Sequence, residues 1–298
     1  MASNTRELRR RIRSIRNTAQ LTRAMKMVSA AKLRRAQDAM MGARPYAAAL
    51  KRTLAGVARR SDPSLNPLLV EREQKVVDLV VVTADRGLCG SFNANIIKRA
   101  EAWRTEQERA GREVHLTLLG RKAADYYRRR PHVKVRETIT GYAREVSVGM
   151  ARKLAEKVEQ RYLAEETDGV YLAFNEFKSV IAQRVIVEPL LPFDEIEKTL
   201  AEQEGGEAPS TAHVDYIYEP EPQALLAKVI SRFLAFEVYH ALLESTAAEH
   251  AARMTAMDSA SRNASELIDK LTLEMNRLRQ ASITTEIIEV VSGAQALG

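Results

Sequence analysis

The C-terminal part of the chain contains about seventy residues without a helix breaker. Pro222 is the last proline, and no glycine follows it before Gly293. One continuous helix from Glu221 to about Val290 would be roughly 105 Å long, because an α-helix rises about 1.5 Å per residue. Helices of that length are rare in globular domains, which leaves a coiled coil, a membrane span or a shaft.

A seven-residue repeat runs through this stretch, and twelve of its sixteen seam positions are apolar. The two rows of seam positions are Val229, Phe236, Leu243, His250, Met257, Ala264, Leu271 and Leu278, and Phe233, His240, Ala247, Met254, Ser261, Ile268, Met275 and Ser282. A strict repeat of seven keeps one face of a helix toward a partner helix, which predicts a coiled coil. Charged residues such as Arg253 and Asp258 interrupt every apolar window long enough for a membrane span.

The seam of this helix changes from large to small side chains along its length. Phe233, Phe236 and Leu243 lie near the start and suit packing against a domain, whereas alanine, serine and methionine dominate further along. Small and flexible side chains allow two helix backbones to approach closely. We therefore predict that the second half of the helix belongs to a slim two-helix rod.

A second long helix is predicted near the N-terminus, over residues 4–41. Apolar and small residues recur there at spacings of three or four. Gly42 and Pro45 are expected to kink or interrupt this helix, because proline removes a backbone donor and clashes with the preceding turn. The helical pattern resumes over residues 46–58.

The two long helices carry opposite charge. Residues 6–35 have a net charge of +10, whereas residues 221–289 have a net charge of −3. Together with the slim seams, this difference predicts an antiparallel coiled coil of the two termini, with the middle of the chain forming a domain at one end. An arginine-rich helix can also neutralise phosphates, so a nucleic-acid-binding coiled coil is an alternative. No aromatic side chains for base stacking are interleaved with those arginines.

The middle of the chain alternates strand and helix patterns, and Val76–Thr83 is typical of a strand buried on both faces. Further strands are predicted over 114–119, 133–139, 169–174 and 183–188, and helices over 91–108, 121–130 and 144–164. This alternation predicts a Rossmann-like α/β domain with a mostly parallel sheet. The expected organisation is a coiled-coil helix over 1–58, a linker over 59–75, the α/β domain over 76–200, a loop over 201–220 and a coiled-coil helix over 221–298.

One turn in this domain is a candidate nucleotide site. Asp85–Ser91 follows the first strand, where a doubly wound fold would place a phosphate loop. The turn has neither the GxGxxG nor the GxxxxGK[ST] spacing. We expect a tight turn in which glycines adopt positive φ and Ser91 caps the next helix. An α/β enzyme that uses this turn to bind a nucleotide is the alternative.

The other reactive side chains form no recognisable catalytic set. Cys89 is the only cysteine, which excludes an internal disulfide and a CxxC motif, and we expect it to be packed and inert. His115 falls within a predicted strand, while His240 and His250 fall on the coiled-coil seam without metal-ligand spacing. These patterns favour a mechanical or scaffolding role. The net charge of +7 suggests an acidic partner, and the lack of a signal-peptide pattern indicates a cytoplasmic protein.

Three motifs resemble the gamma subunit of the F-type ATP synthase, in the order found in that family. They are IRNTAQLTRAMKMVSAAK at 15–32, TADRGLCGSFN at 83–93 and RQASITTEIIEVVSGA at 279–294. The resemblance covers the whole chain, and the third motif is the most specific. Because the paired-cysteine insert of chloroplast relatives is missing, the chain looks like a bacterial member.

The resemblance implies a non-catalytic subunit, the central rotor shaft. The terminal helices would form an antiparallel coiled coil inside a hexamer of alternating alpha and beta subunits, and the α/β domain would form a foot at the membrane side. Proton flow through the membrane ring would turn the shaft, and the turning shaft would take each catalytic beta subunit through its conformations. The shaft subunit would also regulate ATPase activity and proton flow. The resemblance implies no cofactor on this chain, because ATP, ADP and Mg²⁺ belong to the partner subunits. It also implies that the chain binds no nucleic acid.

Individual positions carry over from the family by resemblance. Met25 and Lys26 match positions near an acidic loop of beta, although Met25 can equally be a seam residue. The positions that would hydrogen-bond another loop of beta are Arg253, Arg279, Gln280, Thr284 and Glu286. The apolar shaft tip would consist of Ile283, Ile287, Ile288, Val290 and Val291. Tyr216 and Tyr218 match the foot region near the epsilon subunit and the membrane c-ring, which implies a peripheral hetero-oligomer on the cytoplasmic face of a bacterial plasma membrane.

Overall fold

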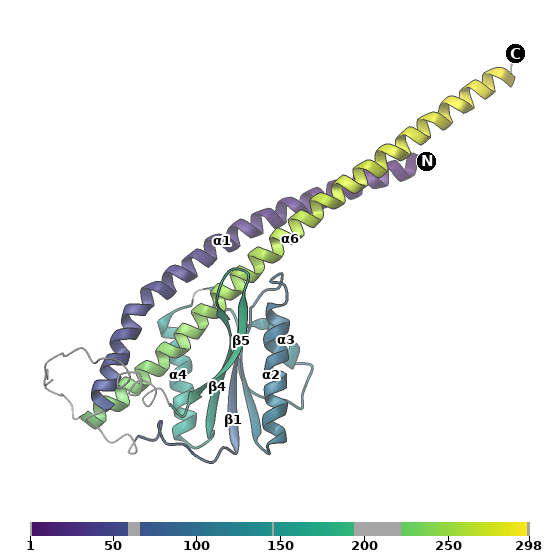
Figure 1. The fold of residues 1–298 in the computed structure, drawn as a ribbon. Helices are drawn as coiled ribbons and strands as arrows, with labels where there is room; N and C mark the ends of the chain where they lie inside the picture. Colours follow the sequence, from purple (N-terminus) through teal and green to yellow (C-terminus); the bar gives the residue numbers. More distant parts are fainter. Residues whose placement is uncertain (1, 59–65, 145, 194–221, 297–298) are drawn as a thin grey trace. The chain divides into compact units, whose positions relative to one another are not determined.

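The structure, a computed structural model, describes residues 2–58, 66–144, 146–193 and 222–296. The chain forms two compact units. The helical unit comprises Met1–Ala30 and Arg253–Gly298, and the sheet unit comprises Ala31–Ala252. Two long helices, α1 (Ala2–Ala58) and α6 (Pro222–Ala296), each contribute to both units (Figure 1).

Both predicted long helices are present, one of them with a correction. Helix α6 is continuous over the stretch that lacks breakers. Helix α1 is not interrupted at Gly42 and Pro45, so the expected interruption is wrong, whereas the alternative of a kink there stays a prediction. Proline removes one backbone hydrogen bond, but the residues that follow pack firmly. Leu54 is buried, and the Tyr46 ring centre lies 5.7 Å from that of Phe236 on α6. This packing stabilises the helical conformation of α1 at Gly42 and Pro45.

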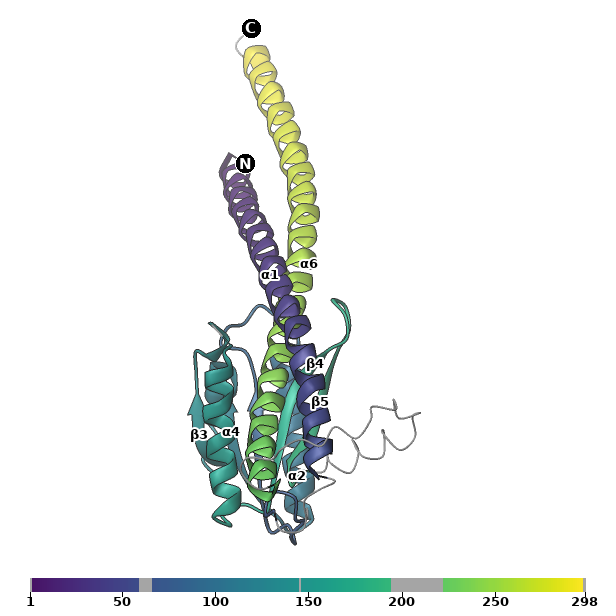
Figure 2. The ribbon, with the colours of Figure 1, turned by 90° about the vertical axis from the view of Figure 1, so that its left-hand side faces the viewer.

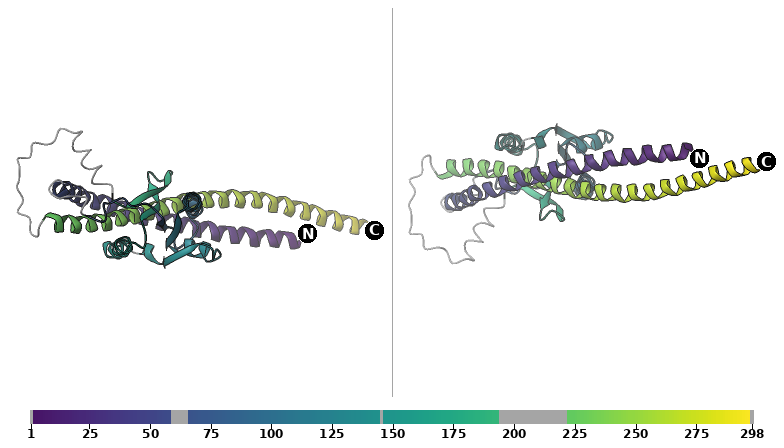
Figure 3. Two further views of the ribbon diagram at one scale, coloured as in Figure 1. Left: turned by 90° about the horizontal axis from the view of Figure 1, so that it is seen from below. Right: turned by 90° about the horizontal axis from the view of Figure 1, so that it is seen from above.

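In the helical unit, α1 and α6 pack side by side and antiparallel. Thr22 Oγ1 lies 2.6 Å from Ser261 Oγ, and Lys26 Nζ lies 2.5 Å from Asp258 Oδ1. Residue numbers therefore rise in opposite directions along the two helices, and both termini lie at the same end of the pair (Figure 3). The other buried residues of this pair include the small Ala19, Ser29 and Ala264, together with the larger Leu8, Ile12 and Met257. The prediction of an antiparallel pair with a slim seam is confirmed.

The sheet unit is built on a five-stranded sheet of order β3-β2-β1-β4-β5. Its strands are β1 (Val76–Val82), β2 (Glu113–Leu119), β3 (Lys134–Ile139), β4 (Gly169–Phe177) and β5 (Gln183–Leu191). Strand β1 is parallel to β2 and β4, and β2 is parallel to β3, whereas β4 and β5 are antiparallel. The predicted mostly parallel sheet is confirmed.

Helices cover both faces of this sheet (Figure 1), and Figure 2 looks onto one of these faces. One face packs against α2 (Phe92–Arg109) and α3 (Arg121–Tyr127). The other packs against α4 (Val148–Leu163), which follows the short 3-10 helix η2 (Tyr142–Arg144), and against the parts of α1 and α6 that belong to this unit. Alternate residues of a strand point to opposite faces. Strand β1 is therefore apolar throughout except at Asp78, because both its faces are covered.

Parts of the predicted organisation fall outside the described residues. The loop expected over 201–220, with Tyr216 and Tyr218, lies there, as does most of the first half of the linker expected over 59–75. The five-part division of the chain stays a prediction.

Candidate functional site

The Asp85–Ser91 turn is occupied by contacts of the chain itself. Asp85 Oδ1 accepts hydrogen bonds from the backbone N–H groups of Arg121 (3.1 Å) and Gly141 (2.9 Å). Leu88 and Gly90 adopt positive φ values of 62° and 57°, as a tight turn requires. Because the acidic side chain of the turn already bonds two backbone donors, the geometry supports a structural turn over a nucleotide loop.

The expectation that Ser91 caps the next helix needs a correction. This residue occupies the N-cap position of α2, but its side chain accepts no hydrogen bond from the first turn of the helix, so the expected cap is wrong. Its φ of −83° and ψ of 1° differ from the extended backbone usual at an N-cap. Its hydroxyl oxygen instead accepts a hydrogen bond from Asn95 Nδ2 at 3.1 Å.

Cys89 is packed, as the sequence predicted. Its side chain is buried beside Ala84, Phe92 and Ala248, and Asn93 Nδ2 donates a hydrogen bond to its Sγ at 3.1 Å. A thiol that is closed off from solvent is poorly placed to act as a nucleophile.

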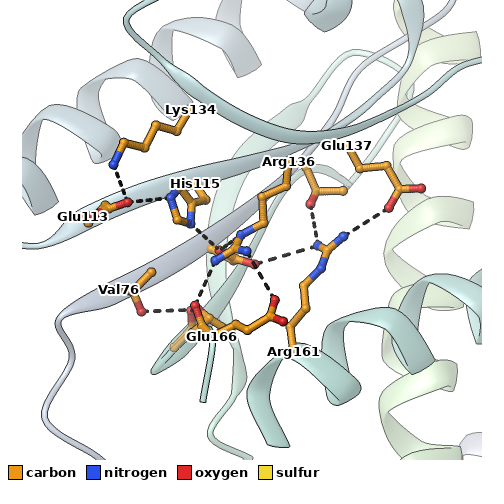
Figure 4. Close-up of polar contacts among 12 residues, drawn as sticks. Val76, Glu113, His115, Lys134, Arg136, Glu137, Arg161 and Glu166 are labelled. Carbon is orange, nitrogen blue, oxygen red and sulfur yellow. Dashed lines mark hydrogen bonds and ion pairs between the residues drawn. The ribbon is translucent and has the colours of Figure 1, made fainter. Parts of the chain in front are cut away.

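A polar cluster surrounds the buried Asp78 on β1. Its partners His115, Arg136 and Arg161 are labelled in Figure 4. Arg136 Nε on β3 lies 3.0 Å from Asp78 Oδ1, and Arg161 Nη1 on α4 lies 3.9 Å from Asp78 Oδ2. His115 Nδ1 on β2 lies 3.7 Å from Oδ1. Burial raises the pKa of Asp78 above its usual value, while Arg136, His115 and Arg161 oppose that shift. The cluster ties three strands to one helix.

An outer ring of charges completes this cluster. Glu113 Oε1 lies 2.7 Å from His115 Nε2 and accepts a hydrogen bond from Lys134 Nζ at 2.5 Å. Glu137 pairs with Arg161 at 3.3 Å and also with Lys157. Across the described ranges, no group of three or more histidine, cysteine or acidic side chains is placed to hold a metal ion. We interpret the cluster as a structural ion network. The sequence alone did not predict this network, although the single acid within a buried strand was a usable signal.

The helical unit presents a basic surface formed by α1. The following arginines are exposed and form no ion pair within the described residues: Arg6, Arg9, Arg10, Arg13, Arg16 and Arg23. Arg11 pairs with Glu7 on the same helix at 2.5 Å. Lys26 pairs with Asp258 and so joins α1 to α6. The positive charge predicted to attract α6 therefore faces mainly outward.

The predicted beta-contact residues occupy two separate places. Met25 is partly buried, consistent with its alternative as a seam residue, and Lys26 is half-exposed despite its ion pair. Arg279, Gln280, Thr284 and Glu286 are exposed and lie within about two turns of α6. Arg253 lies about 39 Å away from Arg279 along the helix and is only 8% exposed. The structure thus groups the positions from 279 to 286 and separates Arg253 from them.

The last turns of α6 are exposed and apolar. The pairing of Thr22 with Ser261 places the start of α1 opposite about residue 281, so α6 continues beyond its partner helix (Figures 1 and 3). The predicted tip residues are all about half exposed or more, namely Ile283 48%, Ile287 58%, Ile288 59%, Val290 72% and Val291 51%. A contiguous exposed apolar patch of this kind marks a binding surface.

Neither α1 nor α6 can cross a membrane, since no helix in the described part of the chain combines the necessary length with sufficient apolar character.

Comparison with known proteins finds relatives over nearly the whole chain. A family model described as ATP synthase matches residues 4–297. The ATP synthase gamma chain of Pelotomaculum thermopropionicum is 47% identical over 292 residues, with 98% of each chain covered. That of Solibacter usitatus is 48% identical over 295 residues, with 97% of this chain and 98% of the relative covered.

Solved structures show a similar fold. The central stalk and c-ring structure of the Tetrahymena thermophila mitochondrial ATP synthase contains a chain that matches with a TM-score of 0.59 and 26% identity, over 81% of this chain and 99% of that one. A chain of the Euglena gracilis mitochondrial ATP synthase matches with a TM-score of 0.67 and 19% identity, over 100% of this chain and 95% of that one. The second match concerns the fold alone.

Proposed function

This chain belongs to the family of ATP synthase gamma chains, and on that premise we propose that it is the central rotor shaft of such an assembly. The observation that carries the proposal is the antiparallel pair of α1 and α6, with α6 ending in an exposed apolar tip. A shaft needs an elongated element that other subunits can surround, and a tip that a sleeve can receive. The chain is a non-catalytic subunit in this proposal, and catalysis belongs to its partners.

Torque transmission requires that the shaft favour one conformation of a catalytic subunit over another. A binding partner shifts a conformational equilibrium only by its difference in affinity for the two states. An asymmetric rod meets each beta subunit of an alpha–beta hexamer with a different face. Turning the rod then moves the favoured conformation from one beta subunit to the next, and ATP hydrolysis in the beta subunits turns the rod in the opposite direction.

The exposed charges of the helical unit supply the contacts for this coupling. The unpaired arginines of α1 and the half-exposed Lys26 suit an acidic loop of beta. The exposed side chains of Arg279, Gln280, Thr284 and Glu286 suit hydrogen bonds to a second loop. Arg253 is mostly buried, so a partner can reach only its exposed edge. The apolar tip is assigned to a sleeve formed by the hexamer.

The sheet unit completes the proposal at the membrane side. It would form the foot that contacts the epsilon subunit and the c-ring, with Tyr216 and Tyr218 near that contact. Such a subunit is peripheral, on the cytoplasmic face of a bacterial plasma membrane, and regulates both ATP hydrolysis and proton flow. It binds no cofactor itself, because ATP, ADP and Mg²⁺ are bound by the alpha and beta subunits.

Reconstitution tests this function directly. The full chain is mixed with purified alpha and beta subunits of the same organism, and ATP hydrolysis is measured on the isolated complex. We expect a single copy of the chain per hexamer, and hydrolysis only when it is present. A chain that ignores alpha and beta but binds DNA with a steep salt dependence, or binds a nucleotide alone, would overturn the proposal.

A charge-reversal variant tests the basic surface. Lys26→Glu should slow ATP-driven proton pumping in membrane vesicles that contain the whole assembly, because it repels an acidic loop. Lys98→Glu, an exposed position on α2, is the control for the change in net charge. The exchange Lys26→Asp with Asp258→Lys restores an internal ion pair between the helices. Recovery of full pumping by that exchange would show that Lys26 serves only the rod.

A further inference from the structure

The sheet unit contains a cavity of about 650 Å³ between α1, α4 and α6, which is open to solvent on one side, where Tyr46 is 53% and Val148 52% exposed. Its lining residues are Ala39, Gly42, Ala43, Tyr46, Val148, Arg152, Glu156, Ser231, Arg232, Ala235, Phe236 and Tyr239. Most of these side chains are apolar or aromatic. Small-molecule sites in proteins are concave and mostly apolar, with about 300–1,000 Å³ of volume and a few convergent polar groups. The cavity meets this description, and the shaft function does not use it.

The cavity is elongated along two helices. Its lining follows α1 from Ala39 to Tyr46 and α6 from Ser231 to Tyr239, which corresponds to about 10–12 Å on each helix. Gly42 leaves open space on α1, since a Cβ added there would meet nothing within 4 Å. The rings of Tyr46 and Phe236 lie 5.7 Å apart. A long space with small residues and aromatic rings suits a linear apolar chain.

The polar residues of the cavity leave a positive charge unbalanced. Arg152 on α4 and Arg232 on α6 form no ion pair or hydrogen bond within the described residues. Glu156 is the one acid in the lining. The hydroxyl of Ser231 does not pair with either arginine, because it donates a hydrogen bond to Glu159 at 2.6 Å. The side chains of Arg152, Arg232 and Glu156 are exposed and together carry a net charge of +1, which favours an anionic ligand at the mouth of the cavity.

We propose that this cavity binds a single-chain acyl carboxylate. The acyl chain lies along α1 and α6, and its carboxylate faces the guanidinium groups of Arg152 and Arg232. The lining lies wholly within the sheet unit and includes none of the residues assigned above to contacts with beta, epsilon or the c-ring.

Decanoate is the probe for this site, used with the full chain below the concentration at which it forms micelles. Isothermal titration should show saturable binding at one decanoate per chain. Decanol, which has the same chain without the charge, should bind about tenfold more weakly, because it lacks the charge-assisted hydrogen bonds. Decyltrimethylammonium should bind more weakly still. Several decanoates per chain, or equal affinity for the three probes, would mean detergent-like adsorption and would overturn the proposal.

Variants of the lining residues test whether decanoate binds in this cavity. Arg152→Gln with Arg232→Gln should weaken decanoate binding about tenfold and leave decanol binding unchanged. Lys153→Gln with Lys228→Gln, exposed positions on the same two helices outside the lining, is the matched control and should bind decanoate normally. Gly42→Leu should fill the open space and abolish binding, while far-ultraviolet circular dichroism confirms the fold. Equal affinity in the two double variants, or normal binding by Gly42→Leu, would refute the site.

Discussion

The sheet unit and the helical unit hold together in different ways. In the sheet unit, large side chains such as Phe233, Leu79 and Leu118 are fully buried, and both faces of the sheet are covered. In the helical unit, the buried contact between the helices consists mainly of small residues such as Ala19, Ser29 and Ala264. Hydrophobic stabilisation scales with the apolar area removed from water. The sheet unit can therefore stabilise itself, whereas the helical unit leaves much of its surface for partners.

This comparison also explains where charge is placed. In the sheet unit, the buried Asp78 is surrounded by Arg136, Arg161 and His115, so its charge is used internally. In the helical unit, six arginines of α1 are exposed and form no ion pair within the described residues, and Arg11 pairs only with Glu7 of the same helix. Internal pairing specifies a fold, whereas exposed charge of one sign serves recognition and association.

The largest expected effect concerns Gly120 in the sheet unit. This residue has a φ of +93°, and a Cβ added to it would lie 2.0 Å from the backbone oxygen of Thr83. Gly120→Ala should lower the free energy of unfolding by about 3–5 kcal/mol, because strain and a backbone clash act together. Urea unfolding, followed by the fluorescence of the single tryptophan Trp103 in α2, measures this change. Gly111→Ala is the control, since Gly111 has a φ of +80° with nothing within 4 Å, and about 1–2 kcal/mol is expected. Equal effects of the two variants would contradict the clash.

The ion network of the sheet unit should show the next largest effect. Asp78→Asn leaves Arg136 and Arg161 without their common buried partner, and should lower the free energy of unfolding by about 2–4 kcal/mol. The same urea experiment measures it. Glu113→Gln in the outer ring should change stability little, because surface ion pairs contribute little. If Asp78→Asn is as stable as the unchanged protein, the ion pairs of Asp78 contribute no net stability, because the cost of burying its charge cancels them.

Substitutions in the shaft tip should affect ATP hydrolysis by the complex but not the stability of the chain. Ile287→Ser with Ile288→Ser should change the free energy of unfolding by less than about 0.5 kcal/mol, because both side chains are more than half exposed. The same variant should reduce ATP hydrolysis by the reconstituted complex. Ile181→Ser, at a position 87% exposed in the sheet unit, is the control and should leave hydrolysis unchanged. A tip variant with normal hydrolysis would remove the tip from the proposed mechanism.

The smallest effect concerns the ion pair of the helical unit. The hydrogen bond from Lys26 lowers the pKa of Asp258. A lowered pKa means that the pair stabilises this unit above the unfolded pKa of about 3.8, and that this contribution is lost as the pH falls through the folded value. NMR titration of the Asp258 carboxyl should give a midpoint below the usual one, and Lys26→Met should raise it. An unchanged midpoint in that variant would show that the pair does not persist in solution.

Several features follow from the sequence alone, because they depend on local periodicity. The length of α6 follows from the absence of breakers, and the slim seam follows from small residues at heptad positions. The strand at Val76 is an unbroken β-branched run, and its burial on both faces follows from that pattern. Such signals lie within one segment and need no knowledge of its neighbours.

Other features depend on residues that are distant in the sequence, and only the tertiary structure decides them. Pro45 is a local helix breaker, but contacts between Tyr46 and Phe236, nearly two hundred residues apart, keep α1 continuous. Asp78 meets Arg136 and Arg161 only because β1, β3 and α4 converge. The cavity between α1, α4 and α6 likewise exists only once three separate helices pack. Local patterns determine what each segment can form, whereas long-range packing determines which local preferences are overridden and which side chains meet.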